Sequence, residues 1–242
     1  MLESLASVGH RQVNLGGQVA DTTPLMTNGF LLIGEDPYWG HGEFVYAQAS
    51  GAISSMALCA ITPAWDATNN RYTYYAAAAP NTANVGKEVG VSIQPLASGS
   101  WGYFKITGIC PVLSTASVAA DTAFGITGAG AIGAISAGKQ ILNARVINPG
   151  TFTISKPNTV GYSGSTIVKP NSASGMFVGA YVSGTGIASG AYVTAIDNAG
   201  AVTLSAANTG NVTGTMTVTY NNGTTFYNVV KLNRSFVQGQ IT

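Results

Sequence analysis

The most regular hydrophobic pattern of the chain lies between residues 40 and 61. Side chains alternate from 43 to 49, which is the period-two spacing of a β-strand. One face of this strand would carry Phe44, Tyr46 and Gln48, and the other Val45, Ala47 and Ala49. Ser50 and Gly51 then make a polar turn, and residues 52–61 are mostly apolar. The pattern therefore predicts a β-hairpin.

Shorter apolar runs predict further strands along the rest of the chain. They lie at residues 30–33, 71–79, 86–95, 101–112, 141–147 and 226–232. Residues 114–138 are rich in Gly and Ala, and repeated Gly opposes a helix interior, so short strands with tight turns are expected there. The predicted fold class is all-β, with a β-sandwich or barrel-like domain.

The composition changes near residue 150, which predicts a second unit within the first. Residues 150–222 are rich in Gly, Thr, Ser and Val, with short runs of β-formers and glycine turns every 8–12 residues or so. The strands expected on either side of this segment, at 141–147 and 226–232, resemble each other, so both are assigned to the first domain. We therefore predict a small inserted β module at 150–222, within a β-rich domain made of residues 25–149 and 223–242.

Both ends of the chain are predicted to be extended. Residues 1–24 are polar and broken by Gly9, Gly16 and Gly17, which indicates an extended N-terminal arm. Residues 233–242 form a polar tail. Terminal segments often become ordered only when they dock, so the arm and the tail are candidates for reaching neighbouring subunits.

Charge is unusually sparse for a chain of this length. The 242 residues include 10 Lys and Arg and 9 Asp and Glu, giving a net charge of +1 and a charged fraction of 8%, against about a quarter in ordinary soluble domains. Weak charge repulsion favours association, often with copies of the same chain. The basic residues are scattered, so nucleic-acid binding is not expected.

The hydrophobic segments predict no membrane span. No apolar run approaches the ~20 residues that a spanning helix needs. The N-terminus lacks a basic region followed by an apolar one, so no signal peptide is expected. We therefore expect synthesis in a cytoplasm, with any release occurring by lysis.

Residue types that could carry chemistry are few. Cys59 and Cys110 lie in apolar runs and are expected to be buried thiols, although a disulfide is possible in principle. His10 and His41 are the only histidines, which leaves too few ligands for a Cys/His metal site.

A small polar group near the first predicted strand has two interpretations. Asp36, His41 and Glu43 lie close in sequence and could form a proton-transfer or metal site. The alternative, which we favour, is a polar loop that leads into the strand.

No sequence motif for catalysis or cofactor binding stands in a suitable context. Ser54, Ser55 and Ser100 lack the G-x-S-x-G elbow. Residues 128–133 match G-x-G-x-x-G, but no apolar strand lies directly before them, no helix-forming stretch follows and no acidic residue lies about 20 positions on. We therefore expect no catalytic, cofactor-binding or metal-binding residues, and do not expect an enzyme.

The aromatic residues have two possible roles. A sugar-stacking surface is one, and packing in a core or a subunit interface is the other and the favoured one. The residues concerned are Trp39, Trp65, Trp101, Tyr72, Tyr74 and Tyr75.

Three segments of the larger domain carry a resemblance to a known family. They are Glu43-Phe44-Val45-Tyr46 after a Gly-rich stretch, residues 86–91 (GKEVGV) and residues 101–108 (WGYFKITG). In this order, followed by an Ala/Gly-rich run and a late strand, they resemble the head decoration (cement) proteins of tailed bacteriophages and their prophage relatives. The resemblance covers residues 25–148 and 226–238. The inserted segment, with VSGTGI at 182–187 and GAYVTAI at 190–196, is similar to a small β module common in phage structural proteins and bacterial surface proteins.

The resemblance implies a structural function. Decoration proteins are small β-rich proteins that bind the outside of an expanded capsid, commonly as trimers. A structural virion protein on the capsid exterior is therefore expected, assembled in the host cytoplasm, with the major capsid protein and its own copies as partners. The insertion is longer than the minimal decoration fold needs. The alternative is a virion-surface or tail adhesin that uses the inserted module to bind host glycans or a receptor.

Overall fold

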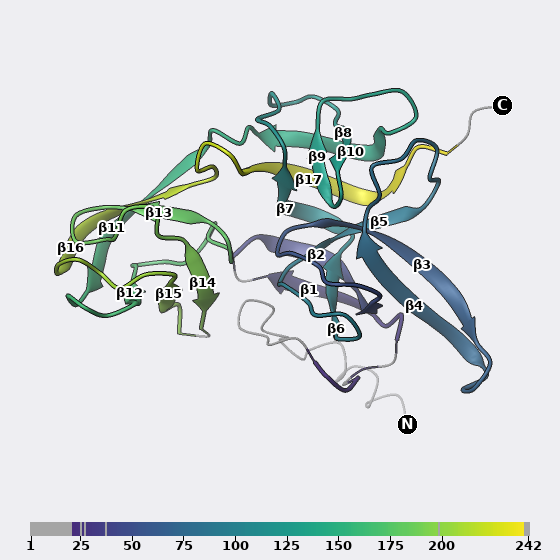
Figure 1. Ribbon diagram of the computed structural model, residues 1–242, viewed down its shortest axis with the longest axis horizontal. Coiled ribbons are helices and arrows are strands. Elements are labelled where there is room, and N and C mark those ends of the chain that lie inside the picture. Colours follow the sequence, from purple (N-terminus) through teal and green to yellow (C-terminus); the bar gives the residue numbers. More distant parts are fainter. Residues whose placement is uncertain (1–20, 25, 27, 37, 198, 240–242) are drawn as a thin grey trace.

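A computed structural model describes residues 21–24, 26, 28–36, 38–197 and 199–239. These residues form seventeen strands and no helix, arranged in two sheets (Figure 1). The predicted all-β, barrel-like fold class is confirmed. Residues 1–20 of the predicted arm (1–24) lie outside the described residues. Residues 240–242 of the predicted tail also lie outside them.

The larger sheet has eleven strands and the smaller has six. The larger contains β1 (Leu31–Asp36), β2 (Gly40–Ala49), β3 (Leu58–Asp66), β4 (Arg71–Ala78), β5 (Glu88–Ser92), β6 (Trp101–Lys105), β7 (Thr107–Ser114), β8 (Gly125–Gly128), β9 (Ala131–Gly133), β10 (Ile141–Asn148) and β17 (Phe226–Val237). The smaller contains β11 (Thr153–Gly161), β12 (Ile167–Lys169), β13 (Tyr181–Ser183), β14 (Val193–Ile196), β15 (Val202–Leu204) and β16 (Val212–Thr219).

Five strands of the larger sheet close into a barrel. β2 pairs in parallel with β4, and antiparallel pairings then link β4 to β3, β3 to β5, β5 to β6 and β6 back to β2. A closed ring has no free edges, and its side chains alternate between the interior and the outer face. Val45 and Ala47 face the interior with Phe104 of β6, whereas Phe44 and Tyr46 pack outside it. The two faces predicted for this strand are confirmed.

The predicted hairpin between residues 43–49 and 52–61 is wrong. β2 pairs with β1, β4 and β6, and β3 pairs with β4 and β5. The connecting segment is bound instead by a distant part of the chain. Ile53 and Leu96 exchange two backbone hydrogen bonds of 2.8 and 2.9 Å, and Met56 N donates to Ser92 O at 2.8 Å. These bonds carry the chain across the barrel, so β3 starts only at Leu58.

The strand predicted at 101–112 is also divided. β6 ends at Lys105 in the barrel, and β7 starts at Thr107 and pairs with β17. Between them Ile106 donates its N–H to Glu43 O and accepts the Arg234 N–H. Gly108 has a φ of +99°, a value that residues with a Cβ rarely adopt. The break lets one sequence segment serve both the barrel and the outer part of the sheet.

The smaller sheet lies between β10 and β17. Its six strands fall between residues 153 and 219, within the interval predicted for the inserted module. Figure 1 shows it at one end of the molecule, away from the barrel. Whether residues 150–222 fold as an independent domain stays a prediction.

An aromatic junction connects the two sheets. Tyr38 and Trp39 lie in the turn between β1 and β2 and contact residues next to the strands of the smaller sheet. The Trp39 indole N–H donates to Met176 O at 3.2 Å, and Gly175 N donates to Tyr38 O at 2.9 Å. The Trp39 ring lies 6.1 Å from that of Tyr220, nearly perpendicular to it. We call the contact of Tyr38 and Trp39 with Gly175, Met176 and Tyr220 the junction.

Candidate functional site

The three polar residues considered as a catalytic or metal group do not converge. The Asp36 carboxylate is buried and accepts the backbone N–H groups of Tyr38 and Trp39 at 2.8 and 3.3 Å. Glu43 instead pairs with Arg234 through two bonds of 2.9 and 3.1 Å, and His41 is exposed. No group of three His, Cys, Asp or Glu side chains suited to a metal ion occurs in the described part of the chain.

Electrostatics agree with these separate roles. Burial raises the pKa of Asp36, although the two backbone bonds and the nearby Lys105 oppose the shift. The hydrogen bonds from Arg234 lower the pKa of Glu43. Asp36 closes a turn and Glu43 anchors a pair of strands, so neither is positioned to exchange protons with His41.

Lys105 is a buried cation that the sequence did not reveal. Its Nζ donates to Trp39 O at 3.3 Å and to Gly40 O at 3.4 Å, and lies 5.4 Å from the Phe44 ring centroid. Burial lowers the pKa of Lys105. The ammonium binds carbonyls of the same turn whose amides bind Asp36. Lys105 is therefore a positioning residue for Trp39.

Two glycines make room for the Lys105 side chain. A Cβ on Gly42 would lie 2.6 Å from Lys105 Cε and 2.5 Å from Thr107 O, and one on Gly108 would lie 3.0 Å from Lys105 Cε. Neither position could hold a larger residue without displacing its neighbours. These two glycines beside a strand lysine are the only sequence signal for the site.

Both cysteines are free and buried, as expected. Burial raises the pKa of the Cys59 thiol and raises that of Cys110 to about 12. A thiol that resists ionisation is a poor nucleophile and a poor metal ligand. Both side chains therefore act as small apolar groups in the core.

The candidate aromatic surface separates into residues with different roles. Trp101 is buried and stacks on Tyr46, with 5.8 Å between ring centroids. Trp39 lies in the junction. Trp65 and Tyr72 remain 54% and 62% exposed and contact each other edge to face at 5.3 Å. The prediction of packing is confirmed for Trp101 and Trp39, whereas Trp65 and Tyr72 form an exposed pair.

This exposed pair lies near the end of a long two-stranded ribbon. β3 and β4 pair from Cys59–Ala78 to Trp65–Tyr72 and Asp66–Arg71. Figure 1 shows the two strands extending together away from the rest of the larger sheet. The Asp66 carboxylate closes the turn by accepting the N–H groups of Thr68 and Asn69. We call Trp65 and Tyr72 the hairpin tip.

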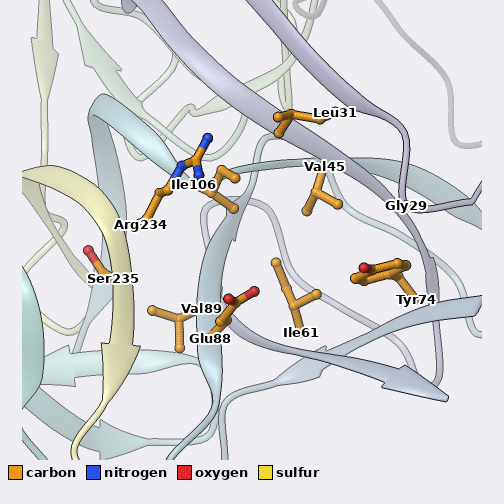
Figure 2. Close-up of a pocket in the computed structure, with 10 residues that line it drawn as sticks. All are labelled: Gly29, Leu31, Val45, Ile61, Tyr74, Glu88, Val89, Ile106, Arg234 and Ser235. Atoms are coloured by element: carbon orange, nitrogen blue, oxygen red, sulfur yellow. The ribbon is translucent and has the colours of Figure 1, made fainter. Parts of the chain in front are cut away.

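A pocket opens at one end of the barrel (Figure 2). Its volume is about 220 Å³. The apolar residues that line it are Leu31, Val45, Ile61, Tyr74, Val89 and Ile106. They come from five different strands and the β6–β7 link, so no single stretch of sequence could predict the pocket. Mouths of β-barrels are common ligand sites.

Charged groups lie along one side of this barrel-mouth pocket. Glu88 and Arg234 line it, and Glu43 binds Arg234 from outside. Within the described residues Glu88 forms no ion pair shorter than 4 Å. The hydrogen bonds to Glu43 raise the pKa of Arg234 most, and Glu88 is still close enough to that guanidinium to raise it further. Two carboxylates therefore lie near one guanidinium at this rim, which leaves an excess of one negative charge.

The edge strand β1 borders the same pocket. Leu31 and Ile33 are 44% and 71% exposed, and lie opposite Val45 and Glu43 in the β1–β2 pairing. Among the described strands β1 pairs with β2 alone. Its other edge has no partner among the described strands, and such an edge can accept a further strand.

Comparisons with protein-family models, with curated proteins and with solved structures found no match for this chain. Among the described residues no helix is long and apolar enough to cross a membrane.

Proposed function

We propose that this chain is a structural virion protein, a decoration protein that binds the outside of an expanded tailed-phage capsid. The observation that carries the proposal is the hairpin tip, an exposed Trp–Tyr pair at the end of a projecting ribbon. Its partners would be the major capsid protein and two further copies of the chain in a trimer. The sequence resemblance described above supplies the capsid setting.

The hairpin tip suits attachment to a protein surface. Trp and Tyr are the residues most enriched at interface hot spots, because they bury a large area with little loss of side-chain entropy. The closed turn at Asp66 and the paired strands hold the two rings before any partner binds. A preorganised anchor loses less entropy on binding.

Many copies on one shell would turn modest contacts into strong attachment. Linked binding events gain from a high effective concentration. A protein that binds only the expanded lattice stabilises that lattice by its binding free energy. The low charge of the chain suits contacts made by apolar groups and backbone.

Copy number tests the proposal directly. Particles purified from a lysate of the host that carries this gene are digested, and the protein is quantified against the major capsid protein by mass spectrometry. A ratio near one, or a simple fraction of one, is expected for a protein that covers the shell. Absence from the particles would overturn the proposal.

A binding assay tests the role of the hairpin tip. Purified expanded heads that lack the protein are mixed with wild-type chain or with Trp65→Ala, and bound chain is measured by sedimentation. Loss of a hot-spot aromatic predicts roughly 30-fold weaker binding. Tyr162→Ala is the matched control, because Tyr162 is 81% exposed and follows β11 of the smaller sheet. Equal loss in both variants would contradict a specific role for the tip.

One observation favours an adhesin as the second candidate. Val160 in β11, Tyr162 directly after β11 and Ile167 in the paired strand β12 are all exposed, and exposed aromatics can stack on sugar rings. The full chain would then bind members of a glycan array, and Tyr162→Ala would not. A handful of copies per particle would also favour this alternative.

A further inference from the structure

We infer that the barrel-mouth pocket is the binding site for one large apolar side chain of an extended partner segment, which adds a strand to β1 and carries a basic residue next to that side chain. The inference is independent of the capsid proposal, because it concerns a different surface from the hairpin tip. Strand addition of this kind takes affinity from main-chain hydrogen bonds and specificity from side-chain pockets.

The size of the pocket selects the ligand class. Sites for drug-sized molecules and cofactors are typically about 300–1,000 Å³, whereas this pocket has about 220 Å³. Its walls are closely packed from behind, since a Cβ on Gly90 would lie 3.0 Å from Ile61 Cδ1 and 3.1 Å from Ile106 Cγ2. A single side chain inserted from outside therefore fits better than a free cofactor.

The walls favour an apolar side chain. Val45, Ile61 and Ile106 supply aliphatic surface, and Tyr74 presents its ring beside them (Figure 2). The Tyr74 ring packs closely on Gly29, where a Cβ would lie only 2.4 Å from ring carbons. Burying a Phe or Leu side chain against such walls removes its apolar surface from water, which favours binding.

The position of β1 favours an extended segment. Leu31 lines the pocket and Ile33 lies further along the same face, and both are exposed. Because the outer edge of β1 has no partner among the described strands, an added strand would cover both side chains and point one of its own side chains toward the pocket.

The rim charge favours a basic neighbour. Glu43 and Glu88 both act on Arg234, but Glu43 alone binds it directly, and among the described residues Glu88 forms no ion pair within 4 Å, so one negative charge is left in excess. Lys87 precedes Glu88 but does not line the pocket. An exposed ion pair contributes little affinity, so this charge should mainly discriminate between partners.

The test uses defined peptides and the full chain. The probe is acetyl-Thr-Val-Phe-Lys-Val-Thr-amide, and binding is followed through the NMR shifts of the Leu31 and Ile33 backbone amides. We expect saturable shifts at these amides, at least tenfold weaker binding when Ala replaces the Phe, and several-fold weaker binding when Glu replaces the Lys. Shifts confined to other surfaces, or no binding by a folded chain, would overturn the inference.

Two variants separate the site from general effects of mutation. Ile106→Trp fills the pocket and should abolish binding, whereas Ile109→Trp, at an exposed position outside the pocket, should not. Glu88→Lys should reverse the preference, so that the Glu peptide binds better than the Lys peptide. This reversal is a readout that simple destabilisation cannot produce. Unchanged binding in Ile106→Trp would overturn the inference.

Two other occupants are also distinguished. If the Phe-Lys peptide binds only after residues 1–20 are removed, the chain's own N-terminal segment occupies the site and the partner-segment inference is wrong. If light scattering shows a dimer that the peptide dissociates, the occupant is a second copy, and the inference is again wrong.

Discussion

Two turns of the larger sheet share one local design but lie in different surroundings. The β1–β2 turn starts at Asp36 and the β3–β4 turn at Asp66. Asp36 Oδ1 accepts the backbone amides two and three residues later at 2.8 and 3.3 Å, and Asp66 Oδ1 does the same at 3.0 and 3.2 Å. Each turn also carries a Trp and a Tyr, Tyr38 and Trp39 within the first and Trp65 and Tyr72 on either side of the second.

The surroundings give the two turns opposite properties. Trp39 is half-buried in the junction and its indole N–H is bonded, whereas Trp65 is exposed beside Tyr72. Burial raises the pKa of Asp36, whereas hydrogen bonds from Asn69 lower the pKa of Asp66. Local sequence therefore sets the turn geometry, and tertiary packing decides whether its aromatic residue joins two sheets or is left to bind a partner.

Removing the smaller sheet should disturb the first turn most and leave the second unchanged. Asn221 Nδ2 donates to Gly150 O at 2.9 Å, so the ends of the excised segment lie close and a short glycine linker can replace residues 151–220. Deletion exposes Trp39 and should lower the free energy of unfolding by about 3 kcal/mol or more. Urea unfolding measures the loss.

Capsid binding supplies the second readout for this deletion. Because the hairpin tip lies on the ribbon, the shortened chain should still bind expanded heads. A second variant combines the deletion with Trp39→Ser. It replaces the newly exposed ring with a polar side chain and so controls for aggregation of the shortened chain. A folded but non-binding deletion variant would place the attachment site in the smaller sheet.

Single tryptophan substitutions should separate the two turns. Trp39→Ala removes a partly buried ring and a bonded indole and should cost about 2–3 kcal/mol. Trp65→Ala removes only a cross-strand contact with Tyr72 and should cost less than about 1 kcal/mol. Urea unfolding curves of the two variants are compared. Similar losses would show that the ribbon depends on its tip more than its exposure indicates.

The sequence predicted the strands better than their pairing. Alternation at 44–49 identified the inner and outer faces correctly, because a closed barrel imposes period two on each strand. Ser50 and Gly51 suggested a two-residue hairpin turn. The actual pairing depends on Leu96 and Ser92, some forty residues away, which bind the connecting segment. The residues around Ser50 and Gly51 alone do not show that a remote segment will bind them in place of a hairpin partner.

The candidate sites were less predictable than the fold. The barrel-mouth pocket joins residues from Leu31 to Arg234, so it exists only after the barrel closes. Lys105 lies in the strand predicted at 101–112, but only the fold buries it and places its Nζ against the β1–β2 turn. The hairpin tip was within a predicted group of aromatics. Its exposure became evident only when the ribbon was seen to extend beyond the barrel.

A methyl group beside Lys105 should perturb the first turn without touching the second. Gly42→Ala places a Cβ about 2.5 Å from Thr107 O, and such overpacking should cost about 1–3 kcal/mol. Gly51→Ala, where nothing lies within 4 Å of the added Cβ, is the matched control and should change stability by less than about 0.5 kcal/mol. Thermal unfolding of both variants tests this. A neutral Gly42→Ala would mean that the lysine stem can move aside.

The smallest effects should come from the two aspartates and should have opposite pH dependence. The folded chain holds the Asp36 proton more tightly than the unfolded chain, so wild-type stability falls as pH rises above the ordinary value of 3.8. Asp36→Asn has no carboxylate to ionise at this position. Its free energy of unfolding should therefore increase relative to that of wild type as pH rises above 3.8. Asp66 has a lowered pKa, so its contribution is lost as pH falls below 3.8, toward the folded pKa.

Asp66→Asn should therefore lose stability relative to wild type as pH rises toward 3.8, and then stay level. Urea unfolding of the two variants and wild type between pH 3 and pH 7 gives both differences in one series. Asn keeps an oxygen that can accept the same backbone amides, so turn closure is preserved in each variant. If both differences changed with pH in the same direction, burial would not be what separates the two turns. The shared hydrogen bonds would then govern both carboxylates.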